Sequence, residues 1–457
     1  MDRRGFLKKT ALMVALAGLF FALAVMLVDR LLQDSRIYEP LSKVVKNYDN
    51  VVNEDGTWYA IRTEKPFVQP TDESMRRWDA EHYDDMRQNL SAKYQRWHGF
   101  FAFYPGFPLF WHLLHVGPLG ISVVNWILYL IGLVLVSLLF GDRLPRWSYA
   151  LLFCAPFAVI FMIPYSEALF FLGIAMGMMG LVKNRYWLYF VGFFVACSTR
   201  AAGNILAVAW IIADLLSALQ ARSSIKETLR NIGLHLAPIA AAVLTVVVIQ
   251  HFCGAEHWFE YVLAQKEWGK ELSWPTWPLT DWSEEGESVT KPLIFTLFIP
   301  ALVWLALSLL KAIKSEERRP METMEVLRLL SVLFFVGNVI LALLTQHGRM
   351  FSQARLLTCT PFFAFLVLDL SAAPKEKAWR WGMLAALLVA AFLCRKMFFN
   401  PVKIGCWIVF MLAILVFFGD RMKPRLRTAL IAACITLNVY WTAYLINCFL
   451  AGGWIFT

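Results

Sequence analysis

The chain alternates long apolar runs with short polar turns. A helix needs about 20 mostly apolar residues to cross a hydrocarbon core of about 30 Å. Such runs fall at 10–28, 118–140, 147–163, 167–182, 186–199, 203–219, 232–250, 292–310, 327–345, 356–371, 381–394, 404–419 and 428–449. The pattern predicts an all-α polytopic membrane protein with about 13 spans, or 11–13 because several runs are short and adjacent, in one integral membrane domain over 1–457.

Three segments interrupt this pattern. Two are long and polar, at 31–98 and at 251–290, and the second is rich in tryptophan. The third, 99–116, is apolar but contains two prolines and two glycines within 99–108, before a full span can form. This segment predicts one of two structures: an interfacial or re-entrant piece, or a helix that lies on the membrane surface. Irregular backbone at membrane depth needs surrounding protein or water.

Composition narrows the class. The chain is 59% hydrophobic and 17% charged, whereas soluble domains are about 45–50% apolar and about 25% charged. This excludes a soluble globular enzyme. Lys and Arg number 43 against 33 Asp and Glu, which gives a net charge of +10. In so apolar a chain the surplus indicates basic cytoplasmic turns rather than nucleic-acid binding, and no nucleic-acid partner is expected.

The positions of the basic residues give an orientation. The first run, 10–28, follows four basic residues and ends without a small-residue cleavage pattern, so it predicts an uncleaved anchor with a cytoplasmic N-terminus. Every second short turn is then basic and inside, and 31–98 and 251–290 are the first and second external loops. The basic residues of the inside turns are Arg143, Arg146, Lys183, Arg185, Arg222, Lys226, Arg230, Lys311, Lys314, Arg318, Arg319, Lys375, Lys377, Arg380, Arg421, Lys423, Arg425 and Arg427.

Two features qualify this assignment. Arg395, Lys396 and Lys403 fall outside in this scheme, which indicates a re-entrant piece or a miscounted span nearby. The compact inside turns and short tails favour a bacterial inner membrane, with the endoplasmic reticulum membrane as the choice for a eukaryotic protein.

The first external loop holds an acidic motif at 76–85, in which Trp78 and Asp79 are followed by Glu81 and His82. On a helix, Asp79, His82 and Tyr83 share a face and offer a base, a hydrogen-bond partner and an aromatic wall. The alternative is a solvated acidic turn with an interfacial tryptophan.

Other candidates are ionisable groups at span ends. Glu167 follows Tyr165 in a tight external turn, where it is either functional or a helix-capping carboxylate. Arg200 lies between two apolar runs and either meets an anionic partner or extends to lipid headgroups.

A third group of ionisable residues lies at 346–355. His347, Arg349 and Arg355 could hold a phosphate bidentately or anchor to headgroups. The chain has no H-E-x-x-H, G-x-S-x-G or Walker pattern. No distinctive metal-ligand set is present either, so no cofactor is predicted, although a divalent metal could neutralise a phosphate instead.

Four ordered blocks resemble a known family. They are Arg77 to Tyr83, Phe101 to Leu109 reading Phe-Ala-Phe-Tyr-Pro-Gly-Phe-Pro-Leu, Tyr165 to Phe170 reading Tyr-Ser-Glu-Ala-Leu-Phe, and Arg200 with Gly203. The chain is similar to the PIG-V type mannosyltransferases, the GPI mannosyltransferase 2 family, which has bacterial relatives. The stretch from His347 to Pro361 resembles the family's C-terminal segment more loosely.

This resemblance implies a GT-C membrane glycosyltransferase. Such enzymes move a sugar, usually mannose, from a polyprenyl or dolichyl phosphate sugar to a lipid-linked or glycan acceptor on the external face, with inversion. Asp79 matches the family's aspartate that acts on the acceptor hydroxyl. Where the family has Arg-Ser-Asn-Gly, this chain has Arg200-Ala201-Ala202-Gly203, which puts the acceptor preference in doubt. The residues predicted to line the substrate site are Trp78, Glu81, His82, Tyr104, Pro105, Tyr165, Glu167, Arg200, His347, Arg349 and Arg355.

The chemistry agrees with this implication. A sugar on a lipid phosphate carries its own leaving group, so the protein needs one carboxylate base, cations that face the phosphate and a groove for the lipid tail. The alternative is a flippase or transporter of a lipid-linked sugar, which would also combine many spans with intramembrane cations. Against it, the chain shows no internal repeat, and its acidic motif lies in a loop.

Overall fold

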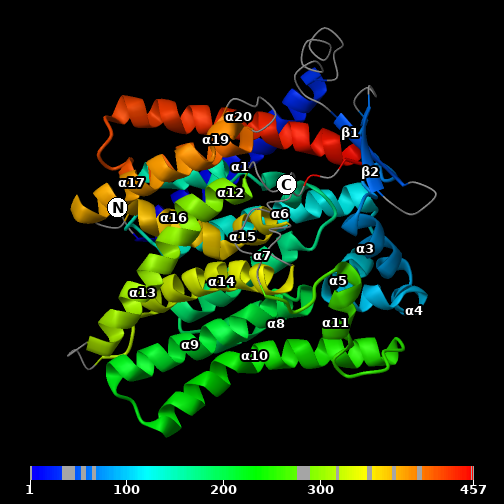
Figure 1. The fold of residues 1–457 in the computed structure, drawn as a ribbon, viewed down its shortest axis with the longest axis horizontal. Coiled ribbons are helices and arrows are strands. Elements are labelled where there is room, and N and C mark those ends of the chain that lie inside the picture. Colours follow the sequence, from blue (N-terminus) through cyan, green and yellow to red (C-terminus); the bar gives the residue numbers. More distant parts are fainter. Residues whose placement is uncertain are drawn as a thin grey trace.

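A computed structural model describes residues 3–32, 47–52, 58–63, 68–274, 289–314, 319–346, 352–372, 377–398, 404–453 and 455. Most helices run along the long axis of the molecule (Figure 1). Seven helices of the described residues are long and apolar enough to cross a membrane. They are α1 (Arg3–Leu32), α6 (Pro118–Leu139), α9 (Gly203–Ala221), α10 (Ile225–Phe252), the run of α12 (Thr290–Leu293), η5 (Ile294–Phe298) and α13 (Ile299–Lys314), α14 (Thr323–Thr345) and α20 (Pro424–Leu450).

Five shorter apolar helices complete the bundle. They are α7 (Glu167–Val182), α8 (Tyr186–Thr199), α16 (Pro361–Ala372), α17 (Lys377–Leu393) and α19 (Ile404–Phe418). Each of these helices falls on one of the apolar runs of the sequence. The protein is therefore a helical, multi-pass membrane protein.

The run at 147–163 is a correction, because it is not an α-helix. It forms two 3₁₀ segments, η2 (Arg146–Cys154) and η3 (Ala158–Met162), on either side of Pro156. Proline lacks a backbone N–H and disfavours helical backbone at the residue before it. Most of the segment is buried inside the bundle, where surrounding protein makes irregular backbone tolerable at membrane depth.

Two buried asparagines replace backbone donors in this broken segment, one next to the break at Pro156 and one at the end of the segment. The Asn438 side chain donates to the carbonyls of Phe153 (2.8 Å) and Ala155 (2.9 Å). The Asn125 side chain donates to the carbonyls of Ile163 (2.8 Å) and Tyr165 (2.9 Å). These bonds satisfy carbonyls that a continuous helix would have paired.

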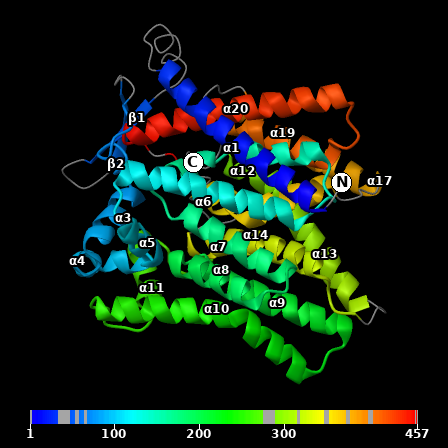
Figure 2. The ribbon, with the colours of Figure 1, turned by 180° about the vertical axis from the view of Figure 1, so that it is seen from behind.

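The predicted first external loop contains a second departure from an all-α structure. Strands β1 (Asn47–Val52) and β2 (Trp58–Thr63) pair antiparallel. Short helices follow: α3 (Asp79–Gln88), α4 (Leu90–Arg96), η1 (His98–Ala102) and α5 (Gly106–Leu114). The hairpin, α3, α4, α5 and α11 (Glu260–Leu263) gather at one end of the bundle, which we call the site end (Figures 1 and 2).

The turn between α9 and α10 and the turn between α19 and α20 lie at the opposite end (Figure 1). Both were predicted to face the cytoplasm on the basis of their arginines. The orientation across the membrane stays a prediction.

The segment predicted as interfacial or re-entrant, 99–116, comprises η1 and α5. With nine residues, α5 is too short to span a bilayer. A Cβ atom on Gly106 would collide with the carbonyl of Ser198, so glycine lets α5 pack directly against the end of α8. The segment thus brings aromatic side chains to the site end of the bundle.

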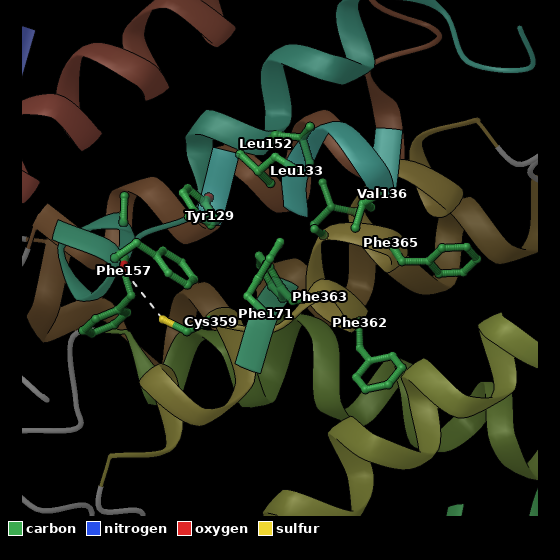
Figure 3. Packing of buried hydrophobic residues seen from close by; sticks show 14 of the residues in the cluster. Tyr129, Leu133, Val136, Leu152, Phe157, Phe171, Cys359, Phe362, Phe363 and Phe365 are labelled. Atoms are coloured by element: carbon green, nitrogen blue, oxygen red, sulfur yellow. Dashed lines mark hydrogen bonds between the residues drawn. The ribbon is translucent and has the colours of Figure 1, made fainter. Parts of the chain in front are cut away.

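The core continues from the broken segment into the bundle. Aromatic rings from α6, α7 and α16 interlock with those of the segment, and the Cys359 thiol lies 3.6 Å from the carbonyl of Phe157 (Figure 3). Tyr129 stacks on Phe161 with 3.8 Å between ring centroids.

Helices α7 and α8 pack unusually closely. A Cβ atom on Gly192 would collide with the backbone of Gly177, and one on Gly180 with that of Tyr189. Small residues allow such close approach between membrane helices. Because the two helices lie so close, Glu167 at the start of α7 lies beside Arg200, which directly follows α8 at the site end.

Candidate active site

Four charged side chains from four separate elements meet at the site end. We call Asp79, Glu167, Arg200 and Arg355 the ionic cluster. Arg200 Nη1 lies 2.5 Å from Glu167 Oε1, and Arg355 Nε donates to the same oxygen. Arg355 Nη1 lies 2.9 Å from Asp79 Oδ2. Glu167 therefore pairs with both Arg200 and Arg355, and Arg355 also pairs with Asp79.

Asp79 is the first residue of α3, and Trp78 before it has φ 55° and ψ −130°. A non-glycine residue with positive φ is strained, and such strain persists only where surrounding contacts impose it. Here the Trp78 indole donates to the carbonyl of Gly453, 3.2 Å away, next to the end of α20. The turn that presents Asp79 is thus fixed to a distant part of the chain.

Arg355 lies on α15 (Gln353–Thr358), a single helical turn. Ser352 before it also has positive φ, at 56°. The guanidinium lies 4.6 Å from the centre of the Tyr165 ring, a cation–π contact. Arg355 is therefore held by two carboxylates and an aromatic face.

A buried hydroxyl pair lies beside the ionic cluster. Ser166 Oγ accepts from Arg200 Nη1 at 2.9 Å and lies 3.0 Å from the Tyr83 hydroxyl. Burial raises the pKa of Tyr83 to about 12, so the phenol is neutral at physiological pH. Tyr83 and Asp79 thus share a face of α3, as the sequence predicted, and Tyr83 acts there as a neutral support.

Exposure separates the two carboxylates of the ionic cluster. The Asp79 side chain is 23% exposed, whereas that of Glu167 is 3% exposed. Arg200 is 14% exposed and Arg355 7%. Asp79 is therefore the more accessible of the two carboxylates, and Glu167 is the buried partner of both arginines.

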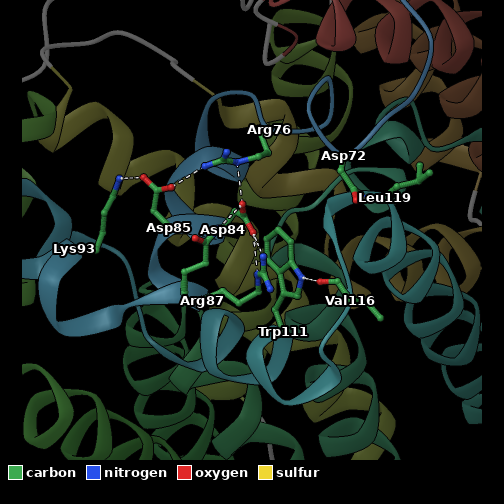
Figure 4. A network of polar contacts seen from close by, with 10 residues as sticks. Asp72, Arg76, Asp84, Asp85, Arg87, Lys93, Trp111, Val116 and Leu119 are labelled. Atoms are coloured by element: carbon green, nitrogen blue, oxygen red, sulfur yellow. Dashed lines mark hydrogen bonds and ion pairs between the residues drawn. The ribbon is translucent and has the colours of Figure 1, made fainter.

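The other acidic residues of the motif have different surroundings. Asp84 and Asp85 bind cations on the far side of the helix: Arg76 lies 2.8 Å from both, and Lys93 Nζ lies 2.7 Å from Asp85 (Figure 4). Asp84 also pairs with Arg87 at 2.6 Å. These contacts fix the fold of the loop. Glu81 is exposed.

His82 packs against a group of rings that we call the aromatic cluster, made of His82, Trp97, Phe100, Phe103 and Trp268. Its ring lies 5.1 Å from that of Phe100 and 5.5 Å from that of Phe103, which Tyr83 also contacts. Burial lowers the pKa of His82, and the nearby Asp79 carboxylate partly offsets this by raising it. The imidazole is therefore a neutral ring in this wall.

Tyr104 and Pro105 are buried at the start of α5. The Tyr104 hydroxyl accepts from the Asn204 amide at 3.4 Å, and its ring meets Tyr261 edge to face at 5.8 Å. They support the region behind the aromatic cluster. His347 and Arg349 lie outside the described residues.

The structure adds one residue that the sequence analysis missed, Lys270. It lies in the loop predicted to be the second external loop, and its side chain is exposed. The surrounding protein lowers its pKa, as do Arg200 and Arg355, while Asp79 raises it. A single lysine in a tryptophan-rich loop carried no sequence signal.

The second loop docks on the aromatic segment through two polar contacts. The Trp268 indole donates to the carbonyl of Gly99 at 2.7 Å, and His98 pairs with the buried carboxylate of Glu260. Trp268 also meets Phe103 edge to face at 5.3 Å. The described parts of the two polar loops thus pack against each other at the site end.

Within the described residues, no group of three or more His, Cys, Asp or Glu side chains is placed to hold a metal ion. Comparison with protein-family models, with curated proteins and with solved structures found no match for this chain.

Proposed function

We propose that this protein is a membrane glycosyltransferase that moves a sugar from a polyprenyl or dolichyl phosphate donor to a hydroxyl acceptor. One observation carries the proposal: a single accessible carboxylate, Asp79, lies among arginines at one end of a helical membrane bundle. The choice of mannose, of GT-C architecture and of the PIG-V family rests on the four sequence blocks. The external face as the site of reaction rests on the predicted orientation.

These residues allow a sugar-transfer step in which each bond and proton has a stated place. The acceptor oxygen attacks the anomeric carbon of the donor sugar, a new C–O bond forms, and the bond from that carbon to the phosphate oxygen breaks. The acceptor proton passes to the Asp79 carboxylate, and the lipid phosphate leaves as an anion. General-base assistance of this kind contributes about 10²–10⁴-fold. Attack opposite the leaving group inverts the anomeric centre.

Each part of the ionic cluster has a role in this proposal. Arg355 orients the Asp79 carboxylate through the 2.9 Å contact. Glu167 holds Arg355 and Arg200 side by side, and Ser166 and Tyr83 complete the support. The aromatic cluster offers ring faces of the kind on which sugars stack.

The position of the ionic cluster favours transfer over transport. Its four residues lie at helix ends or on short external helices, whereas the substrate sites of secondary transporters lie near the bilayer midplane. A flippase for a lipid-linked sugar remains the competing function, and one experiment separates the two.

Purified protein in nanodiscs, supplied with polyprenyl phosphate mannose and a panel of lipid-linked and glycan acceptors, tests the proposal. We expect a glycosylated product by mass spectrometry, together with stoichiometric release of polyprenyl phosphate. Proteoliposomes with fluorescent lipid-linked sugar provide the second arm. Movement of the lipid between leaflets with no product in the first arm would replace transfer by transport.

A further inference from the structure

The end of α20 reaches the site end of the bundle, near the hairpin of β1 and β2 (Figures 1 and 2). The helix ends at Leu450, and Gly452 after it has a φ of 90°, which suits glycine. The Gly452 N–H donates to the carbonyl of Phe449 at 3.0 Å. The next N–H, of Gly453, donates to the carbonyl of Cys448 at 2.7 Å. These two bonds form a Schellman motif, which holds the backbone of Gly453 against the helix end.

The first contact from this helix end reaches the residue before Asp79. The indole of Trp78 donates to the carbonyl of Gly453 at 3.2 Å. Trp78 has φ 55° and ψ −130°, a conformation that a non-glycine residue keeps only where its surroundings impose it. Asp79 follows directly as the first residue of α3. The bond to Gly453 therefore holds the backbone from which the Asp79 carboxylate extends.

The second contact reaches the partner of that carboxylate. Phe449, in the last turn of α20, meets the Tyr165 ring edge to face with 5.9 Å between centroids. Tyr165 presents its ring to Arg355, whose guanidinium lies 4.6 Å from the ring centre. All three side chains are buried. Close packing of buried side chains restricts their movement, so the end of α20 also helps to place Arg355.

Both routes meet at one ion pair, because Arg355 Nη1 lies 2.9 Å from Asp79 Oδ2. The contacts thus form a closed ring, in which the end of α20 joins the turn at Trp78 to the ring of Tyr165. The Asp79 side chain is 23% exposed, and an exposed ion pair is weak by itself. The geometry of this pair therefore depends on the packed anchors on either side of it.

We propose that Trp78 and Phe449 are positioning residues, which set the Asp79 carboxylate against Arg355 through the end of α20. This inference rests on the proposed function, in which Asp79 takes the acceptor proton. Trp78 was predicted to line the substrate site, whereas its indole N–H is bonded to Gly453. Misplacement of a reacting group by about 1 Å can lower the rate about 100-fold. The end of α20 thus contributes to the rate of transfer, although it supplies no charge to the site.

The placement of Asp79 can be measured without sugar transfer. The probe is a water-soluble carbodiimide with glycine ethyl ester, added to the full-length protein in nanodiscs, and mass spectrometry follows the labelling of each carboxylate. Trp78→Phe keeps a ring but removes the indole N–H, and Phe449→Leu removes the ring that packs on Tyr165. We expect each variant to speed the labelling of Asp79 several-fold relative to the exposed Glu73, because a carboxylate released from its ion pair is more open to the reagent.

Trp407→Phe is the matched control. The Trp407 indole also donates to a backbone carbonyl, that of Phe398, at 3.3 Å, but it lies on α19 and touches no member of the ionic cluster. Its substitution removes the same kind of hydrogen bond. The labelling of Asp79 in Trp407→Phe should therefore equal that of wild type.

Kinetics provide a second measurement. With polyprenyl phosphate mannose as donor, we expect Trp78→Phe to lower kcat by about 10- to 100-fold at a nearly unchanged donor KM, and Trp407→Phe to change neither. In an Asp79→Asn background, Trp78→Phe should have little further effect on the residual rate. Substitutions of residues that act through one another are not additive, whereas a general effect on folding would persist in that background.

The outcomes separate the inference from the function. Wild-type labelling of Asp79 in both Trp78→Phe and Phe449→Leu overturns the inference, whether or not sugar is transferred. Faster labelling in these variants, with no transfer by the wild type, upholds the positioning of Asp79 and overturns the transferase. Equal acceleration at Asp369, a buried carboxylate of α16, would reveal a general loosening of the fold and overturns the specific role, as do additive effects of Trp78→Phe and Asp79→Asn on kcat.

Discussion

Arg355 Nη1 lies 2.9 Å from Oδ2 of Asp79, although the two residues are far apart in the chain. The contact joins α3, in the loop predicted to be the first external one, to the six-residue helix α15 between α14 and α16. Each of these two elements begins directly after a residue with positive φ, Trp78 or Ser352. The pair is thus built from two strained turns, which are frequent at functional sites.

The first prediction concerns Asp79. We expect Asp79→Asn to lower the rate of sugar transfer by about 10²–10⁴-fold, because the amide still accepts a hydrogen bond from Arg355 but cannot take a proton. The rate is measured with purified protein at saturating donor. Glu73→Gln is the control, since Glu73 is an exposed carboxylate of the same loop and was not assigned to the site. Near-normal turnover by Asp79→Asn would exclude a general-base role.

The second prediction concerns Glu167 and stability. Glu167→Gln leaves the buried guanidinium of Arg355 and that of Arg200 without their shared carboxylate. Loss of one partner from a buried ion pair costs about 3–5 kcal/mol. The melting temperature in detergent should fall by several degrees, while Glu271→Gln, at an exposed pair, should leave it unchanged. An unaltered melting temperature would mean that Glu167 does not hold the arginines together.

The third prediction concerns Arg200. Arg200→Ala removes a contact to Glu167 and one to Ser166. If the arginine positions the site, kcat falls while the KM for the donor changes little. Arg230→Ala, in an exposed part of α10, provides the comparison. A clear rise in the donor KM at unchanged kcat would instead make Arg200 a ligand of the donor phosphate.

The fourth prediction concerns the broken segment at 147–163. Asn438→Leu leaves the carbonyls of Phe153 and Ala155 without their donor. An unsatisfied buried group costs about 1–3 kcal/mol. The melting temperature should fall, whereas the kcat of the remaining folded protein should stay near that of wild type. A parallel loss of kcat would tie the segment to the site.

The sequence by itself determined the membrane class and most of the helices. Apolar runs of sufficient length must bury their backbone polar groups in helices, and twelve of the thirteen runs coincide with the helices described above. It also singled out Asp79 in the first polar loop and Glu167, Arg200, Arg349 and Arg355 near span ends, as charges that the topology does not require.

Tertiary structure decided which of these charges meet and what each contacts. The glycines of α7 and α8 bring Glu167 and Arg200 together, and no local pattern encodes that approach. Tertiary packing also placed His82 among aromatic rings. Pro156 and the two asparagines turned an apolar run into a buried 3₁₀ segment. Hydrophobic length is a local property of the chain, whereas ion pairs and caps depend on residues that only folding brings within reach.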